Sequence, residues 1–323
     1  MANRSMNNLT EIIQAESHPP LLENLGIIPV LVLLFSGISL NGCFIVAYLR
    51  RSVSASHFNF CMFHLSISNF LQLLLFLPYA VSNVSLIPHD ENWVVESILC
   101  TIVRGLGFFW IAAVSASWIL CYMSVLRLRL ISSPLQRFKI TKKRSSIVFA
   151  VIWILAIFLW SPFFFSKKLN DDQTKCIRYY ERSPILFHFH SRFVMFAGFW
   201  APLSINLTAY TAIVIRMYRR EGEQTHVNSN RHRKRVIIVL GILNTIFVVC
   251  WLPMLLQWAL TVTDIIKGHE KQQLAYKYCT IPCLAAGTLN IVCSINSRAA
   301  LKRLVCCTRK TTDRSSCSVD SIK

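Results

Sequence analysis

Seven apolar stretches, each long enough to cross a lipid bilayer, constrain the fold of this chain more than any other feature. A membrane-spanning helix needs about 20 residues, because the hydrocarbon core of a bilayer is about 30 Å thick. Only 15% of the 323 residues are charged and 54% are hydrophobic, whereas a soluble protein carries about 25% charge. We therefore expect an all-α membrane protein with a bundle of seven helices. The predicted spans are 27–49, 59–82, 102–126, 146–165, 193–215, 236–262 and 276–295.

The distribution of charge predicts the orientation of the bundle. An odd number of spans places the two termini on opposite sides of the membrane. With the N-terminus outside, the cytoplasmic segments hold 23 of the 34 Lys and Arg residues and 4 of the 15 Asp and Glu residues, so the net charge of +19 lies inside. This is the positive-inside bias of membrane proteins. The basic charge therefore favours anionic lipid and an acidic cytoplasmic partner rather than DNA or RNA.

The chain divides into an extracellular tail (1–26), the bundle (27–295) and a cytoplasmic segment (296–323). We interpret the first apolar stretch as a span and not as a signal peptide, because it lacks a small-residue cleavage site. The tail carries glycosylation sequons at Asn3 and Asn8. After the seventh span, a basic amphipathic stretch predicts a short surface helix. Cys306 and Cys307 follow this predicted helix and are candidate palmitoylation sites.

The sixth span contains a proline in an otherwise uninterrupted apolar run. Pro253 removes one backbone hydrogen bond and should kink the helix, and the freed carbonyl group then needs a partner from a neighbouring helix or from water. Trp251 lies two residues before it. Two interpretations remain open: a hinge that responds to a ligand, or a kink that only shapes the packing.

Most of the 12 cysteines lie in apolar spans, where they are expected to behave as small buried hydrophobic residues. Cys100 and Cys176 fall in outer segments, where the oxidising environment allows them to pair. Cys279 and Cys283 form a second disulfide candidate, although their spacing of one helical turn also suits simple packing. No spacing indicates a zinc site or any other metal site, and no cofactor is expected.

Over its whole length the chain resembles the rhodopsin-like (class A) G-protein-coupled receptors. Each helix carries a landmark residue of that family at the expected spacing, and so does the predicted surface helix. The matching residues are Asn41, Asn59, Asn69, Pro78, Trp93, Cys100, Trp153, Pro162, Pro202, Tyr210, Phe247, Cys250, Trp251, Pro253, Asn290 and Leu301.

Three motifs depart from the family pattern. The acidic residue of the second helix is replaced by Asn69, and the Asp-Arg-Tyr motif of the third helix reads Leu126-Arg127-Leu128. The Asn-Pro-x-x-Tyr motif of the seventh helix reads Asn290-Ile-Val-Cys-Ser294. The distance from Cys100 to Arg127 is also two residues longer than usual. Either the third helix contains a bulge or one of these two assignments is shifted.

The resemblance implies a plasma-membrane receptor that transmits the binding of an extracellular ligand to a heterotrimeric G protein. The implied ligand pocket comprises Phe109, Trp110, Phe199, Trp251 and Trp258. The implied activation switch comprises Asn69, Phe247, Trp251, Pro253 and Asn290. The implied G-protein interface comprises Leu126, Arg127, Pro134 and Tyr210. The same resemblance implies that Cys100 pairs with Cys176.

Other functions remain as alternatives. The altered motifs leave open a non-signalling protein of the same fold that scavenges ligand or dimerises with another receptor. A transporter would need ionisable residues within the spans, yet all 15 acidic residues lie in loops or tails. No span holds a catalytic constellation, so an enzyme is not expected. A small amine is disfavoured because Gly107 or Phe109 occupies the family's counter-ion position. Outer loops with charges of both signs favour a peptide over a lipid.

Overall fold

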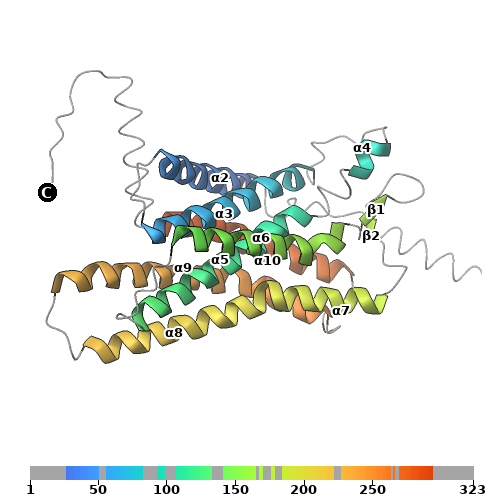
Figure 1. Cartoon of the computed structure of the whole chain (residues 1–323). Helices are drawn as coiled ribbons and strands as arrows, with labels where there is room; N and C mark the ends of the chain where they lie inside the picture. The colour runs from blue at the N-terminus through green and yellow to red at the C-terminus, as the bar shows by residue number, and fades with distance from the viewer. Residues whose placement is uncertain are drawn as a thin grey trace, which may run out of the picture.

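The structure, a computed structural model, confirms the predicted bundle. Its long helices lie side by side (Figure 1). The residues that it describes are 27–50, 56–82, 93–98, 100, 106–132, 141–164, 167–169, 176–178, 184–221, 227–262, 265 and 269–293. The predictions for Asn3, Asn8, Pro134, Cys306, Cys307 and the surface helix lie outside these residues.

Among the described residues, six helical stretches are long and apolar enough to cross a membrane, and a shorter apolar stretch, Cys279–Val292, lies within the last helix. The fifth membrane-spanning unit is composite, because α7 (Pro184–Met195) continues through the π-helical segment η2 (Phe196–Trp200) into α8 (Ala201–Glu221). The remaining long helices are α2 (Ile27–Leu49), α3 (His57–Ser82), α5 (Gly107–Ser132), α6 (Lys142–Phe164), α9 (Val227–Val262) and α10 (His269–Cys293).

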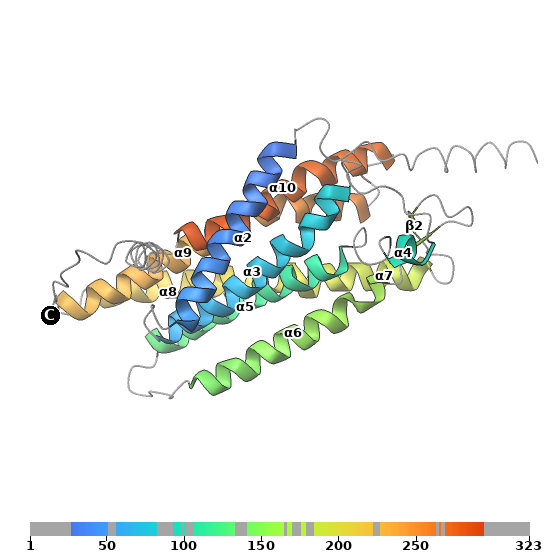
Figure 2. The same cartoon turned by 90° about the horizontal axis from the view of Figure 1, so that it is seen from above.

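Three small elements lie together at the outer end of the bundle (Figure 2). They are the short helix α4 (Trp93–Ile98) and an antiparallel pair of strands, β1 (Lys167–Leu169) and β2 (Cys176–Arg178). Leu169 is paired with Cys176, so the strands bring the predicted disulfide residue next to the outer end of α6. The sequence analysis did not predict these strands, because three-residue strands in a charged loop leave no hydrophobic alternation to detect.

The predicted span 27–49 matches α2, and the second and sixth spans end where α3 and α9 end, whereas several other ends differ because hydropathy marks only the apolar part of a helix. α9 begins nine residues before the predicted start, with a polar first turn. α5 begins at Gly107, five residues after the predicted start at 102, and the residue before it, Leu106, adopts a left-handed conformation with φ of 54°. From Gly107 to Ser132 α5 is an uninterrupted α-helix, so no bulge lies in that part of the third helix.

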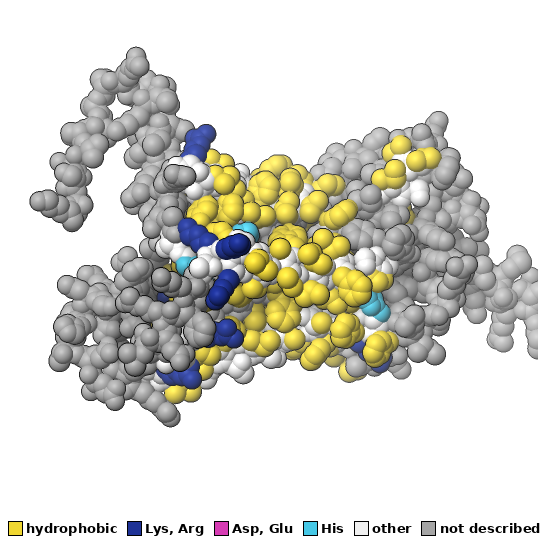
Figure 3. All heavy atoms as spheres, in the orientation of Figure 1, with side chains coloured by type: hydrophobic (Ala, Val, Ile, Leu, Met, Phe, Trp, Pro, Cys, Tyr) yellow, Lys and Arg dark blue, Asp and Glu magenta, His cyan; other side chains and the backbone are white. Residues whose placement is uncertain are grey.

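The third helix, α5, lies at the centre of the bundle. It packs against α3, α6 and α8, while α2 packs against α3 and α10. Of the apolar part of α5, 83% is buried, against 17% for α6 at the edge. Figure 3 shows an apolar band around the middle of the molecule, with Lys and Arg side chains gathered mainly at the end that carries the C-terminus. This distribution agrees with the orientation predicted from charge.

Candidate functional site: the aromatic core and the inner face

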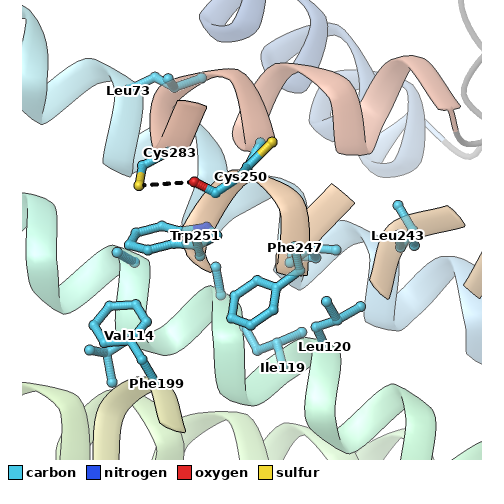
Figure 4. Close-up of a cluster of buried hydrophobic side chains, with 14 of the residues drawn as sticks. Leu73, Val114, Ile119, Leu120, Phe199, Leu243, Phe247, Cys250, Trp251 and Cys283 are labelled. Atoms are coloured by element: carbon cyan, nitrogen blue, oxygen red, sulfur yellow. Dashed lines mark hydrogen bonds between the residues drawn. The ribbon is translucent and has the colours of Figure 1, made fainter. Parts of the chain in front are cut away.

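The kinked sixth helix is bonded to the seventh beside its proline. Pro253 lies within α9, and the thiol of Cys283 in α10 donates a hydrogen bond to the carbonyl oxygen of Cys250 at 3.4 Å (Figure 4). The same sulfur lies 3.3 Å from the carbonyl oxygen of Cys279 in its own helix. Pro253 has no N–H to donate to the carbonyl oxygen of Val249, four residues back, and the Cys283 thiol bonds to the carbonyl oxygen of the next residue, Cys250.

The second disulfide candidate is wrong, because Cys279 and Cys283 are both free thiols. One turn of helix separates them. Residues four apart on a helix have Cβ atoms about 5–6 Å apart, whereas a disulfide needs about 3.5–4.5 Å. The thiol of Cys283 instead serves the backbone of α9.

Trp251 lies at the centre of an aromatic cluster between α5, η2 and α9. It is 3% exposed and stacks on Phe199 with ring centroids 4.8 Å apart. Trp110 approaches Trp251 edge-on at 6.2 Å, and Phe247, one turn further inward on α9, lies at 6.1 Å. Figure 4 shows Phe247 beside Ile119 and Leu120 of α5. A displacement of Trp251 would therefore change side-chain contacts in three membrane-spanning units.

The aromatic cluster continues toward the outer side. Trp110 stacks on Trp160 of α6 at 5.2 Å, and Trp160 stacks on Phe163 at 4.8 Å. Phe109 lies edge-on to Trp110 and also contacts Phe76 of α3. Four of the five predicted pocket residues, Phe109, Trp110, Phe199 and Trp251, are thus buried against one another, while Trp258 is half-buried. Their contact with a ligand stays a prediction.

The third helix is bonded to the fifth through backbone groups that Pro202 and the π-helical turn release. Pro202 has no N–H to donate to the carbonyl oxygen of Gly198, and this oxygen accepts a hydrogen bond from the hydroxyl of Ser117 at 2.8 Å. In the π-helical turn, Ala201 donates to Phe196 five residues back, and the indole of Trp118 donates to the carbonyl oxygen of Ala197 at 3.1 Å. The sequence analysis missed both cross-links.

Three buried amides lie at the middle of the bundle, the family landmark Asn41 and the predicted switch residues Asn69 and Asn290. Asn41 Nδ2 donates to the carbonyl oxygens of Gly37 at 2.8 Å and Gly287 at 3.1 Å, and so ties α2 to α10. Asn69 and Asn290 are 3% and 5% exposed. A Cβ atom built on Gly287 would lie 3.7 Å from that of Asn69, so α3 and α10 meet there. The structure places Asn69 close to α10 with a neutral amide in the family's acidic position.

Replacing the acidic residue by Asn69 should make the protein insensitive to sodium. In the family this residue is the counter-charge of a bound sodium ion, and a desolvated cation without one is costly. The unfolding temperature of the purified protein should not change when sodium replaces a bulky organic cation at constant ionic strength. Asn69→Asp should introduce a sodium-dependent rise of about 2 °C or more. A comparable rise in the wild-type protein would contradict this prediction.

At the inner face, Arg127 lies next to a residue that cannot pair with it. Leu126 is buried, and the guanidinium carbon of Arg127 lies 5.9 Å from the centre of the Phe58 ring of α3, within cation–π range. The hydroxyl of Tyr210 in α8 lies so close to Gly241 of α9 that a Cβ atom there would collide with it. Glycine therefore permits the close approach of the fifth and sixth helices.

Two polar cross-links at the inner end were not predicted. The hydroxyls of Tyr122 in α5 and Ser145 in α6 are 2.6 Å apart, and Ser145 Oγ lies 2.9 Å from Nε2 of His57 in α3. The guanidinium group of Arg216 in α8 donates a hydrogen bond to the hydroxyl of Ser132 at the end of α5. These polar residues lie at the ends of apolar spans, where sequence alone does not tell a cross-link from a solvated side chain.

Cys100 is disulfide-bonded in the structure. The side chain of Cys176 lies outside the described residues, so the pairing of these two cysteines stays a prediction. The other cysteines with described side chains are free thiols, namely Cys43, Cys61, Cys121, Cys250, Cys279 and Cys283.

Substitution of Cys100 by serine should reduce the amount of protein at the cell surface. Loss of a native disulfide from an extracellular segment costs about 2–5 kcal/mol. Surface labelling of cells would measure the loss, and Cys43→Ser, a substitution of an exposed free thiol, is the matched control. Detection of free thiols at both Cys100 and Cys176 in surface protein would refute the pairing.

The described residues contain no group of three or more His, Cys, Asp or Glu side chains that could hold a metal ion. The buried core contains stacked aromatic rings, neutral amides, hydroxyl groups and free thiols. Such groups can bind, transmit a displacement and hold helices together.

The family described as 7 transmembrane receptor (rhodopsin family) matches residues 40–294, and the chain belongs to it. Neuropeptide receptor 22 of Caenorhabditis elegans is 24% identical over 66% of this chain and 51% of its own length. Neuropeptide Y receptor type 4 of Rattus norvegicus is 26% identical over 68% of this chain and 60% of its own length. Cysteinyl leukotriene receptor 1 of Sus scrofa is 25% identical over 51% of this chain and 48% of its own length. The chain thus spans about half to three fifths of these relatives.

Proposed function

We propose that this protein is a plasma-membrane receptor that transmits the binding of an extracellular peptide to a heterotrimeric G protein. The observation that carries the proposal is the buried aromatic cluster around Trp251, on a sixth helix that contains Pro253, in a protein of the rhodopsin family. A ligand that favours one packing of this cluster shifts the balance between inactive and active bundles. It transmits no signal if it binds both packings equally well.

The proposed ligand is a peptide that binds above the aromatic cluster. Trp110 and Phe199 are buried, 8% and 0% exposed, so in this proposal the ligand acts on the cluster from its outer side. The outer loops carry charges of both signs, which suits the termini and side chains of a peptide. The names of two similar receptors, neuropeptide receptor 22 and neuropeptide Y receptor type 4, support this class. A lipid is the second candidate, which the name of the similar leukotriene receptor favours.

The proposed G-protein interface is the inner end of the bundle. Arg127 and Tyr210 would line the opening that forms when the third, fifth and sixth helices part, with Leu126 and Pro134 beside it. The basic inner side would attract anionic lipid and an acidic surface of the partner. We further propose glycosylation of Asn3 and Asn8 and palmitoylation of Cys306 and Cys307.

A screen of secreted peptides in a cell reporter assay with several classes of G protein tests the proposal. At least one peptide should produce a response in cells that carry this protein at the surface, and none in cells that carry Trp251→Ala at the same level. A bioactive lipid panel run in parallel distinguishes the second candidate. If ligands bind but no G protein responds, the protein is instead a scavenger or a dimer partner.

A further inference from the structure

Three polar side chains lie buried in the inner halves of the third, fifth and sixth membrane-spanning units. Ser124 in α5, Asn206 in α8 and Asn244 in α9 are 0%, 2% and 5% exposed. Asn244 Nδ2 donates a hydrogen bond to Ser124 Oγ at 3.3 Å. A buried amide destabilises a protein unless it is hydrogen-bonded, so each of these two amides needs hydrogen-bond partners.

Asn206 lies at the same depth as this hydrogen bond, as the contacts between the third and fifth helices indicate. Ser117 is bonded to the carbonyl oxygen of Gly198, and α5 and α8 run in the same direction from that point. Ser124 follows Ser117 by seven residues and Asn206 follows Gly198 by eight. At about 1.5 Å per residue, the two positions lie about 11 and 12 Å further inward.

A contact between the fifth and sixth helices leads independently to the same level. The hydroxyl of Tyr210 lies against Gly241. Asn206 lies four residues outward from Tyr210, and Asn244 lies three residues outward from Gly241 on the antiparallel helix. These steps correspond to about 6 and 5 Å, so the two amides share one level between α8 and α9.

The unpaired atoms of the two amides are chemically complementary. Asn206 Nδ2, Asn206 Oδ1 and Asn244 Oδ1 are buried and have no hydrogen-bond partner among the described residues. The N–H groups of Asn206 can donate to Asn244 Oδ1, either directly after a side-chain rotation or through one water, which typically makes about three hydrogen bonds. Either arrangement joins Asn206 to the existing bond between Asn244 and Ser124.

We propose that Ser124, Asn206 and Asn244 form an uncharged polar latch that holds the inner halves of α5, α8 and α9 together in the inactive packing. The role of the latch rests on the proposed function, in which these helices separate during activation. Since all three side chains are neutral, the latch is insensitive to salt and to pH between 5 and 9.

The latch predicts that the inner ends of α5 and α9 separate when one amide is removed. Nitroxide labels at Arg129→Cys and Ile238→Cys, both at exposed positions, report this separation by double electron–electron resonance. The measurement uses the full chain in lipid nanodiscs, without ligand or G protein, after other label-accessible thiols have been replaced. Asn244→Leu and Asn206→Leu should each raise the ratio of separated to closed molecules about fivefold, the effect of one lost hydrogen bond.

The design separates the latch from general damage and from the proposed function. Thr208→Val is the matched control, because this exposed hydroxyl on α8 bonds only to its own helix, and it should leave the distances unchanged. Ser124→Ala, the smallest change, should also raise the ratio and covers the case in which an asparagine variant does not fold. The double variant of Asn206 and Asn244 should separate no further than either single variant.

Wild-type distances in Ser124→Ala and in both asparagine variants, or fully additive effects of the two asparagine substitutions, would overturn the latch. The readout needs no ligand and no G protein. A protein that fails to activate any G protein can therefore still show the latch, and a failed latch leaves the proposed function intact.

Discussion

Trp251→Ala is expected to abolish the response to an activating peptide and to lower the stability of the folded protein. The indole is almost fully buried and contacts Phe199, Trp110 and Phe247. Truncation of a buried tryptophan typically costs about 3–5 kcal/mol, because the cavity left behind closes only in part. The response should fall to background at matched surface expression, and the unfolding temperature of the purified protein should fall with it.

Two controls separate the loss of the signal from the loss of stability. Trp251→Phe keeps an aromatic ring in the cluster and should retain part of the response. Phe158→Ala removes an aromatic ring that is 74% exposed on α6 and should change neither quantity. Full potency and amplitude in Trp251→Ala would show that the aromatic cluster does not transmit the signal.

Leu126→Asp is expected to lower ligand-free G-protein activation about tenfold. In the family, the acidic residue at this position holds the neighbouring arginine in an ion pair of the inactive state. Leu126 is only 9% exposed, and an introduced carboxylate would lie next to Arg127, so the pair would be partly buried. A gain of about 1.4 kcal/mol for the inactive state shifts the equilibrium about tenfold.

Leu126→Asn provides the control, since asparagine has nearly the shape of aspartate but no charge, and this variant should lower the basal signal much less.

The altered seventh helix works in the opposite direction. Ser294 lacks the aromatic ring of the family tyrosine and cannot place a hydroxyl group where that tyrosine does. A hydrogen bond from the tyrosine hydroxyl would favour the active state by about 1 kcal/mol. Ser294→Tyr should therefore raise the basal signal. A background signal in the wild-type protein, in Leu126→Asp and in Ser294→Tyr would contradict both predictions.

Apolar length and periodicity were sufficient to predict the bundle, because the bilayer imposes a fixed thickness on every span. The predicted first span and α2 share both ends, and the sixth ends at the same residue as α9. Helix starts in polar sequence could not be located in this way. Leu106, directly before α5, adopts a left-handed conformation, and leucine gives no signal for that conformation in the sequence.

The aromatic residues near the hinge could be predicted, but their arrangement could not. The proline and tryptophan of α9 marked the region, and the structure brings Trp251 and Phe199 into a stack. Trp110 and Phe199 are buried in this stack instead of lining the wall of an open pocket. Their burial is set by how each helix is rotated about its own axis. The rotation depends on packing between helices and is not encoded in the spacing of one span.

The polar cross-links between helices were the least predictable part. Asn41 matched a landmark of the family, but Ser117, Ser124 and Asn244 carry no motif. A serine in an apolar span can equally bond to its own helix, as Ser204 does to the carbonyl oxygen of Trp200. Only the placement of neighbouring helices decides which carbonyl or hydroxyl group lies within reach.

The central claim is that an extracellular peptide changes the packing around Trp251 and so activates a G protein. Nucleotide exchange on purified heterotrimers, with the full chain in nanodiscs that contain anionic lipid, tests it most directly. A peptide from the screen should accelerate exchange with the wild-type protein and not with Trp251→Ala. If that peptide binds the wild-type protein but accelerates exchange on no class of G protein, the protein does not signal in this way, and the account is wrong.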